Sequence, residues 1–127
     1  MNNQTRILLL FGAVNGLLYV ALSAFAAHAL KNTVSLEQLA WFKTAAHYQG
    51  IHALALLATG ILLQLFERRS FYISGILMLL GIFIFSGSLY AMALGAPRWF
   101  GAITPIGGVS LIAGWALMIA GLLQKDS

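Results

Sequence analysis

Long apolar runs alternate with short polar stretches along this chain. Four runs dominate, over residues 7–30, 47–66, 71–94 and 106–123. A helix rises 1.5 Å per residue, so each run has about the length of a helix that crosses the ~30 Å hydrocarbon core of a bilayer. A backbone in lipid must satisfy its own hydrogen bonds, which a helix does. The pattern predicts an all-α membrane protein, an antiparallel bundle of four transmembrane helices in one domain, residues 1–127.

The second of these helices is expected to begin well before its apolar run. Ser35 followed by Gln38 is typical of a capping box, so the helix should start at Leu36 and continue to Phe66. Such a helix is about 46 Å long, which exceeds the thickness of the hydrocarbon core. We therefore expect an interfacial segment, residues 36–46, that extends the second span.

Two further local signals concern a helix start and helix packing. Thr104 and Pro105 predict the start of the last helix, with Thr104 as its N-cap and proline in the first turn. Gly12 and Gly16 form a G-x-x-x-G pair, which favours close approach of a neighbouring helix in a membrane, although glycine is also common there without such a role.

Composition supports the membrane class and narrows the partners. The chain is 61% apolar and 8% charged, with a mean hydropathy of +0.90, whereas soluble domains carry about 25% charged residues. The seven basic residues are spread over the expected helix ends, so they form no patch for nucleic acid, and we expect no nucleic-acid partner. The absence of cysteine excludes disulfides and thiolate metal sites.

The first apolar run could also be a secretory signal sequence. It begins after Arg6 and contains small residues near its end, as a cleavage site does. Residues 7–30 are longer than the usual apolar region of a signal peptide, about 7–15 residues, so we interpret them as a span.

Basic residues give a weak indication of orientation. An even number of spans places both termini on one side of the membrane. Four basic residues lie at that end, namely Arg6, Arg68, Arg69 and Lys125. Three lie at the opposite end, namely Lys31, Lys43 and Arg98. Lys and Arg are enriched on the cytoplasmic side, so the termini are expected to be cytoplasmic in a bacterial inner membrane.

Polar residues within the spans gather in the half of the bilayer away from the termini. This set is His28, His47, Tyr48, Gln49, His52, Ser86, Ser88, Tyr90 and Thr104. Polar groups are costly inside a membrane, so their positions carry information. One interpretation is a polar pocket that binds a ligand; the other is a network of hydrogen bonds that holds the helices together. The sequence favours the network, and the pocket remains the alternative interpretation.

Catalysis and metal binding find little support. His47 and His52 lie about 140° apart around a helix, so they do not share a face. The acidic residues, Glu37, Glu67 and Asp126, lie outside or at the edges of the spans, so no carboxylate completes a metal site, a proton path or a catalytic triad at depth. We expect no enzyme activity, no metal and no cofactor. Two histidines on different helices could still hold a haem, so a haem- or quinone-binding membrane anchor remains an alternative.

Four motifs together resemble a known family. They are Ala26-Ala-His-Ala-Leu30, Phe42-Lys-Thr-Ala-Ala-His-Tyr-Gln49 with His52-Ala-Leu-Ala-Leu56, Phe85-Ser-Gly-Ser-Leu-Tyr90, and Thr104-Pro-Ile-Gly-Gly108 with Gly114-Trp115. Their order and spacing resemble the small bacterial membrane proteins of domain of unknown function 423, which have a mitochondrial relative in animals. The resemblance covers nearly the whole chain. The chain departs from the family pattern at the first motif, where Ser23-Ala-Phe-Ala-Ala27 replaces the usual glycine-rich start.

The resemblance implies a multi-pass protein of the bacterial inner membrane and supplies no activity, substrate or catalytic residue. One staphylococcal member of this family is linked with keeping the membrane intact. Our hypothesis is a non-enzymatic protein that supports envelope integrity, with membrane lipids as partners, a lipid or small amphiphile as possible ligand and self-association into a homo-oligomer. A passive channel or transporter subunit is the alternative.

Overall fold

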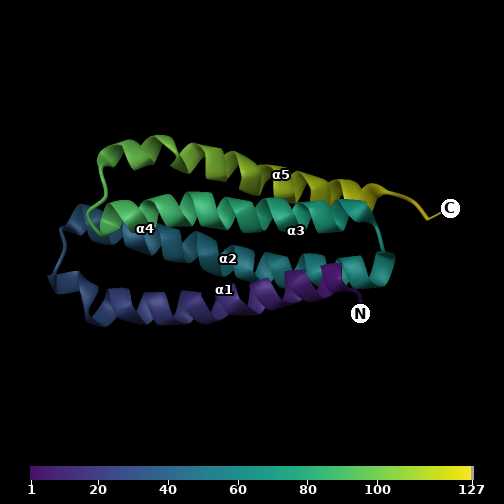
Figure 1. The fold of residues 1–127 in the computed structure, drawn as a ribbon, viewed down its shortest axis with the longest axis horizontal. Helices are drawn as coiled ribbons and strands as arrows, with labels where there is room; N and C mark the ends of the chain where they lie inside the picture. The colour runs from purple at the N-terminus through teal and green to yellow at the C-terminus, as the bar shows by residue number, and fades with distance from the viewer. Residues whose placement is uncertain (127) are drawn as a thin grey trace.

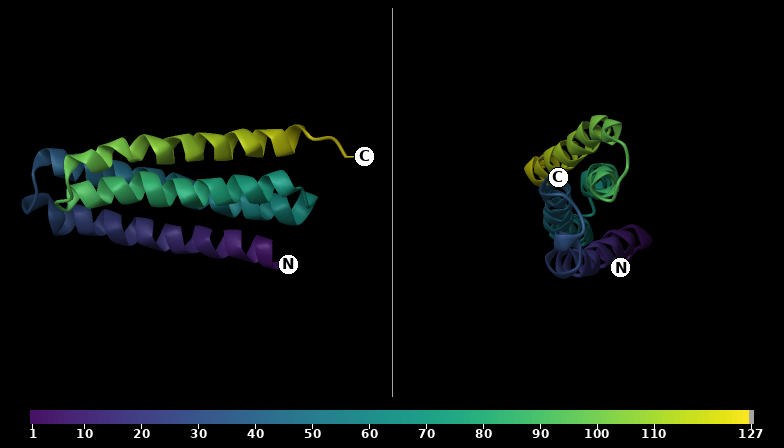
Figure 2. Two further views of the ribbon diagram at one scale, coloured as in Figure 1. Left: turned by 45° about the horizontal axis from the view of Figure 1, so that its top comes forward. Right: turned by 90° about the vertical axis from the view of Figure 1, so that its left-hand side faces the viewer.

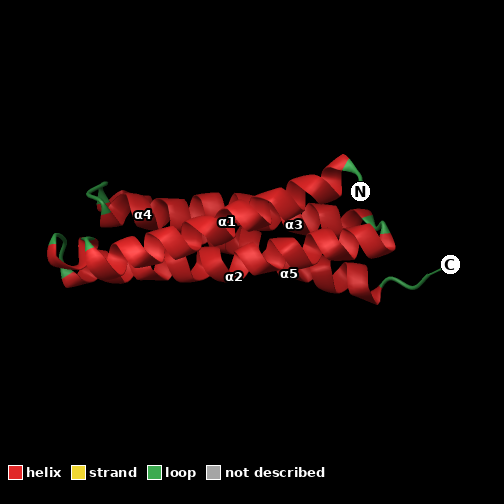
Figure 3. Ribbon diagram, turned by 90° about the horizontal axis from the view of Figure 1, so that it is seen from below, coloured by secondary structure: helices red, strands yellow, loops and turns green. Residues whose placement is uncertain are grey.

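Four long helices run antiparallel in the computed structural model, which describes residues 1–126 (Figure 1). The helical elements are α1 (Asn3–His28), η1 (Leu30–Asn32), α2 (Leu36–Phe66), α3 (Arg69–Gly81), η2 (Ile82–Ser86), α4 (Gly87–Ala93), η3 (Arg98–Ala102) and α5 (Thr104–Leu123). The described residues contain no strand. Both termini lie at one end of the molecule, as Figure 3 also shows. The predicted all-helical bundle is confirmed.

The elements α3, η2 and α4 form one continuous rod, which we call the third span (Arg69–Ala93). The element η2 is a single π-helical turn inside this rod. Each of the four rods is long and apolar enough to cross a membrane. Because the chain turns back after each rod, consecutive rods alternate in direction.

Capping residues determine where the first two rods begin. The Asn2 side chain accepts a hydrogen bond from the Thr5 amide at 2.8 Å, so α1 begins one turn before the apolar run. The predicted capping box is present, since the Ser35 hydroxyl and the Gln38 amide side chain each accept a hydrogen bond from the other residue's backbone N–H. The helix α2 then continues without interruption for 31 residues.

The predicted cap of the last helix is wrong. Ile103 is already helical and follows the 3₁₀ turn η3, so Thr104 is the first residue of α5 and its hydroxyl caps no backbone amide. Pro105 does occupy the first turn, as predicted. Because the turn η3 enters the helix directly, the Thr104 hydroxyl is available to another helix.

The two middle rods of the chain, α2 and the third span, also form the centre of the bundle. The end-on view in Figure 2 shows α1 and α5 at opposite sides of this pair. Half of the spanning window of α2 is buried inside the chain, compared with 17% for α1 and 28% for the last rod. The outer helices therefore leave wide apolar faces for lipid.

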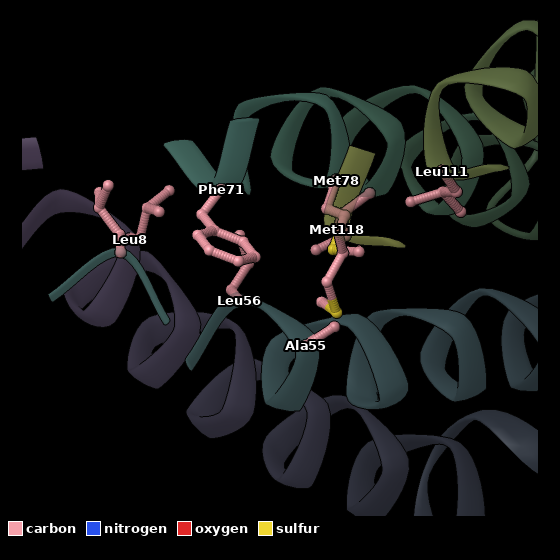
Figure 4. Close-up of a cluster of buried hydrophobic side chains, with 9 residues drawn as sticks. Leu8, Ala55, Leu56, Phe71, Met78, Leu111 and Met118 are labelled. Atoms are coloured by element: carbon pink, nitrogen blue, oxygen red, sulfur yellow. The ribbon is translucent and has the colours of Figure 1, made fainter. Parts of the chain in front are cut away.

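Buried side chains of all four rods meet in one apolar core nearer the end that holds the termini (Figure 4). Leu8, Leu56, Phe71 and Met78 are fully buried there. A second cluster around Phe42 packs residues 26, 30, 39 and 93 near the opposite end. The predicted interfacial extension of α2 is thus helical and packed.

Glycines bring α5 against the third span. Gly107, Gly114 and Gly121 recur every seven residues on the buried face of α5, and a Cβ on Gly107 would lie 2.3 Å from the Phe85 amide nitrogen. The Ser74 hydroxyl donates a hydrogen bond to the Gly114 carbonyl at 2.5 Å, which requires this close approach. Small residues with interhelical hydrogen bonds are typical of helix packing in membranes.

The G-x-x-x-G pair of α1 is confirmed at one of its two positions. A Cβ on Gly12 would lie 3.1 Å from the Ala53 carbonyl oxygen of α2, so this glycine permits close packing. Gly16 faces open space, with nothing within 4 Å of an added Cβ.

Candidate functional site

Three polar side chains from three rods form a hydrogen-bonded chain near the middle of the bundle. The Gln49 amide nitrogen donates to Asn15 Oδ1 at 2.9 Å, and the Tyr90 hydroxyl donates to Gln49 Oε1 at 2.7 Å. Asn15 Nδ2 donates in turn to the Phe11 carbonyl at 2.8 Å. We call Asn15, Gln49 and Tyr90 the central network. It connects α1, α2 and the third span.

His52 belongs to a second arrangement, between α2 and α5. Its Nδ1 lies 2.7 Å from the Tyr48 carbonyl oxygen, and its Nε2 lies 2.9 Å from Nε1 of Trp115. The carbonyl can only accept and the indole N–H can only donate. These partners require a neutral imidazole with its proton on Nδ1. The Tyr48 ring stacks one turn away, with 7° between the ring planes.

Serine and threonine hydroxyls of the predicted set connect the remaining rods. The Ser86 hydroxyl, in the π-helical turn, donates to the Ala45 carbonyl at 2.8 Å. The Ser88 and Thr104 hydroxyls lie 2.6 Å apart and join the third span to α5. Ser86 and Ser88 are buried, and each hydroxyl has a partner, so these groups hold the helices together.

The other members of the predicted set face outward. His28, His47 and Tyr48 are exposed, and Tyr48 is 39% exposed. His47 and Gln49 are two positions apart on one helix, which places them on different faces. The nine predicted residues therefore do not share one pocket: six are hydrogen-bonded between or along helices and three lie on the surface.

Two residues that complete these arrangements were missed. Asn15 is not among the nine predicted residues, yet it is 6% exposed and hydrogen-bonded to Gln49. Trp115 is also outside the predicted set, and its indole donates to His52. The signal that could have found both is the cost of burying a polar group, since each had to find a partner on another helix.

A groove runs beside the central network and opens sideways to the lipid. Its volume is about 300 Å³, and its lining is mostly apolar. Phe11, Leu18 and Phe83 are among its walls, while Asn15, Gln49 and Tyr90 contribute its polar atoms. We call it the α1–third-span groove. Two of the nine predicted residues, Gln49 and Tyr90, line it.

A larger hollow, about 490 Å³, lies at the terminal end between α1, the end of α2 and the third span. Asn2, Arg69 and Tyr72 line it, and none of the nine predicted residues does. We assign no chemistry to this hollow, because Glu67 offsets the charge of Arg69 in its lining.

His52 is poorly placed to ligate a metal or a haem. Within residues 1–126, no three His, Asp or Glu side chains cluster in a way that could bind a metal ion. Both ring nitrogens of His52 already have hydrogen-bond partners, so axial ligation would require breaking the bond to Trp115 or to the Tyr48 carbonyl.

Four apolar rods with interhelical hydrogen bonds define a multi-pass integral membrane protein. Comparison with known proteins is consistent with this class. The profile of the family "Protein of unknown function (DUF423)" matches residues 22–108. The chain belongs to this family, also designated UPF0382.

Curated relatives cover nearly the full length of the chain. It is 42% identical over 120 residues to the UPF0382 inner membrane protein YgdD of Escherichia coli K12, covering 94% of this chain and 92% of that protein. It is 41% identical over 119 residues to the UPF0382 membrane protein SSP2132 of Staphylococcus saprophyticus, covering 94% and 98%. No solved structure matches the chain significantly. The protein is therefore a multi-pass inner membrane protein.

Proposed function

We propose that this protein is a non-enzymatic component of the bacterial inner membrane that supports membrane integrity by binding a neutral amphiphile. The proposed site is the α1–third-span groove. The observation that carries the proposal is the polar central network in an otherwise apolar groove that opens to lipid.

The depth of the network indicates where the ligand comes from. Asn15 lies about 18 Å along a helix of about 39 Å, and Gln49 about 20 Å along one of about 46 Å. Both are near the middle of their rods, so a ligand must enter from the hydrocarbon region. A charged group is expensive at that depth, which favours a neutral ligand with a carbonyl or hydroxyl group.

The network retains hydrogen-bonding capacity for such a ligand. Each carboxamide has two N–H donors, and the bonds to Phe11 and Asn15 use one from each. The Tyr90 hydroxyl donates to Gln49 and keeps a lone pair. A carbonyl or hydroxyl in the groove would meet both donors and an acceptor.

A channel receives less support than a binding site. A conducting path needs polar groups that face a continuous lumen, whereas the hydroxyls of Ser74, Ser86 and Ser110 all donate to helix carbonyls. We also propose cytoplasmic termini, from the excess of basic residues at that end, and self-association, because Gly16 and Gly87 are open to a neighbouring helix.

Native mass spectrometry tests the ligand. The full chain would be released from nanodiscs formed from a bacterial inner-membrane lipid extract, and retained neutral lipids would be identified. Gln49→Leu should abolish retention, whereas Gln64→Leu, at an exposed position of the same helix, should not. Val14→Trp fills the groove while Asn15, Gln49 and Tyr90 are all kept, and it should also prevent retention. Equal retention by Val14→Trp and the wild type would exclude the groove.

The role in membrane integrity requires a cellular measurement. In a strain lacking the protein, the wild type and Gln64→Leu should restore resistance to a membrane-permeable dye, and Val14→Trp should not. Restoration by Val14→Trp would separate the phenotype from the groove.

A further inference from the structure

A separate hollow of about 270 Å³ lies between α1 and α2, on the half of the bundle away from the termini. Tyr19, Ser23 and Ala27 line it from α1, and Lys43 and His47 line it from α2. The pairs Tyr19 with Ser23 and Lys43 with His47 are each four residues apart, so each pair occupies one face of its helix. We call this hollow the Lys43 groove.

The polar groups of the Lys43 groove differ from those of the central network because they have no protein partners. Within residues 1–126, no hydrogen bond involves the side chains of Tyr19, Ser23, Lys43 or His47. Tyr19, Lys43 and His47 are exposed and Ser23 is half-buried, so these four groups are accessible to a ligand from outside the chain.

The charge of the groove is positive. The ion pairs of the described residues are Arg68 with Asp126 and Arg98 with Glu37, and Lys43 belongs to neither. No acidic side chain lines the hollow. A ligand that complements this lining carries a negative charge and several hydrogen-bond acceptors, as a phosphodiester does.

The depth of Lys43 matches the head-group region of a bilayer. It lies about 10 Å from the start of α2, a helix of about 46 Å that exceeds the ~30 Å hydrocarbon core by roughly 8 Å at each end. Lys43 is therefore near the edge of the hydrocarbon, and His47 is one turn deeper. The groove places a cation at the level of lipid phosphates.

The shape of the groove is fixed by small residues and by one aromatic ring. Ala26, Ala27 and Ala46 leave space between the helices. The Tyr19 ring lies against Gly50, where an added Cβ would be 2.7 Å from the ring, and this contact holds the tyrosine beside the hollow. An acyl chain can follow the apolar surface of α1 from here.

We propose that the Lys43 groove binds the phosphate of an anionic phospholipid from the leaflet at the end opposite the termini. Lys43 supplies the charge, while His47, Tyr19 and Ser23 lie around the same hollow as further hydrogen-bonding groups. This site is distinct from the α1–third-span groove and does not depend on the function proposed for it.

The test uses the full chain in nanodiscs that contain equal amounts of phosphatidylglycerol and phosphatidylcholine. Lipids retained after release are counted by native mass spectrometry. The wild type should retain phosphatidylglycerol preferentially, and Lys43→Gln should reduce this preference about fivefold, the effect expected for one lysine near an anionic surface. Lys31→Gln removes the same charge from an exposed position outside the groove and should have little effect.

A second variant separates the groove from charge alone. Ala27→Phe fills the hollow at an exposed position and keeps Lys43, so it should also lower phosphatidylglycerol retention. Equal losses in Lys43→Gln and Lys31→Gln, or full retention in Ala27→Phe, would overturn the proposal. Displacement of the lipid by excess inorganic phosphate would assign the site to a soluble anion instead.

The outcome is independent of the first proposal. Val14→Trp should leave phosphatidylglycerol retention unchanged, and Lys43→Gln should leave retention of a neutral amphiphile unchanged. Each binding proposal is therefore tested by its own variants, and one proposal can be contradicted without affecting the other.

Discussion

The indole N–H of Trp115 donates a hydrogen bond to Nε2 of His52, with 2.9 Å between the nitrogens. This bond joins α2 to α5, two helices that make little other contact. The opposite ring nitrogen of His52 faces the Tyr48 carbonyl at 2.7 Å. The two partners together define both the rotamer and the tautomer of a buried histidine.

The first prediction concerns this tautomer. Nitrogen-15 NMR of the protein in nanodiscs should show His52 as a neutral imidazole with the proton on Nδ1, because the carbonyl requires a donor and the indole requires an acceptor. Trp115→Phe removes the indole donor and should shift the Nε2 resonance most. His47, which is exposed, serves as the internal control. A proton on Nε2 in the wild type would contradict the described bond.

The second prediction compares two adjacent glycines of α5. Gly107→Ala should destabilise the protein by about 1–3 kcal/mol or more, because its Cβ would lie 2.3 Å from the Phe85 backbone nitrogen, which cannot move aside easily. Gly108→Ala places its Cβ 3.7 Å from the Phe85 ring, which is an ordinary contact, so this variant should be nearly neutral. Unfolding in mixed detergent with increasing SDS gives both free energies. Similar changes for the two variants would show that the backbone contact with Phe85 does not decide the effect, since helix propensity alone favours alanine at both positions.

The third prediction separates two contacts of Arg68. Its guanidinium donates to the Gly121 carbonyl at 2.7 Å and pairs with Asp126. The Arg68 side chain is 10% exposed and that of Asp126 is 86% exposed. Arg68→Ala should cost about 1–3 kcal/mol, because it leaves the end of α5 without a donor, whereas Asp126→Asn removes an exposed ion pair worth about 0–1 kcal/mol. The same unfolding assay measures both, and a larger loss for Asp126→Asn would reverse this assignment.

The fourth prediction tests the proposed orientation. The chain lacks cysteine, so single cysteines can be introduced without background labelling. In intact spheroplasts, an impermeant thiol reagent should label Lys31→Cys and Trp99→Cys and should not label Arg69→Cys. After the membrane is opened, Arg69→Cys should react as well, which controls for accessibility. The opposite pattern would place the termini outside.

Local signals predicted the elements better than their contacts. The capping box at Ser35 and Gln38 depends on residues three positions apart, so the sequence contains the whole interaction. Thr104 failed as an N-cap because η3 enters α5 directly and Ser88, sixteen residues earlier, takes the hydroxyl instead. That partner is close in space only after the helices have packed.

The sequence predicted which polar residues lie within the spans but not which of them meet. Gln49, His52 and Tyr90 belong to the predicted polar set, and each is hydrogen-bonded to another helix or to its own. The partners Asn15 and Trp115 could not be assigned, because several antiparallel pairings match them in depth. The rotation of each helix about its axis decides which pairing forms.

Hydropathy and length alone determined that this chain consists of four membrane-spanning helices, since lipid offers the backbone no other way to satisfy its hydrogen bonds. The tertiary structure decided that α2 and the third span lie at the centre, that the glycines of α5 receive Phe85 and Met78, and that the polar side chains divide between a central network and an unpaired, positively charged groove. These outcomes depend on which faces of the helices meet, and packing of small against large side chains sets those faces.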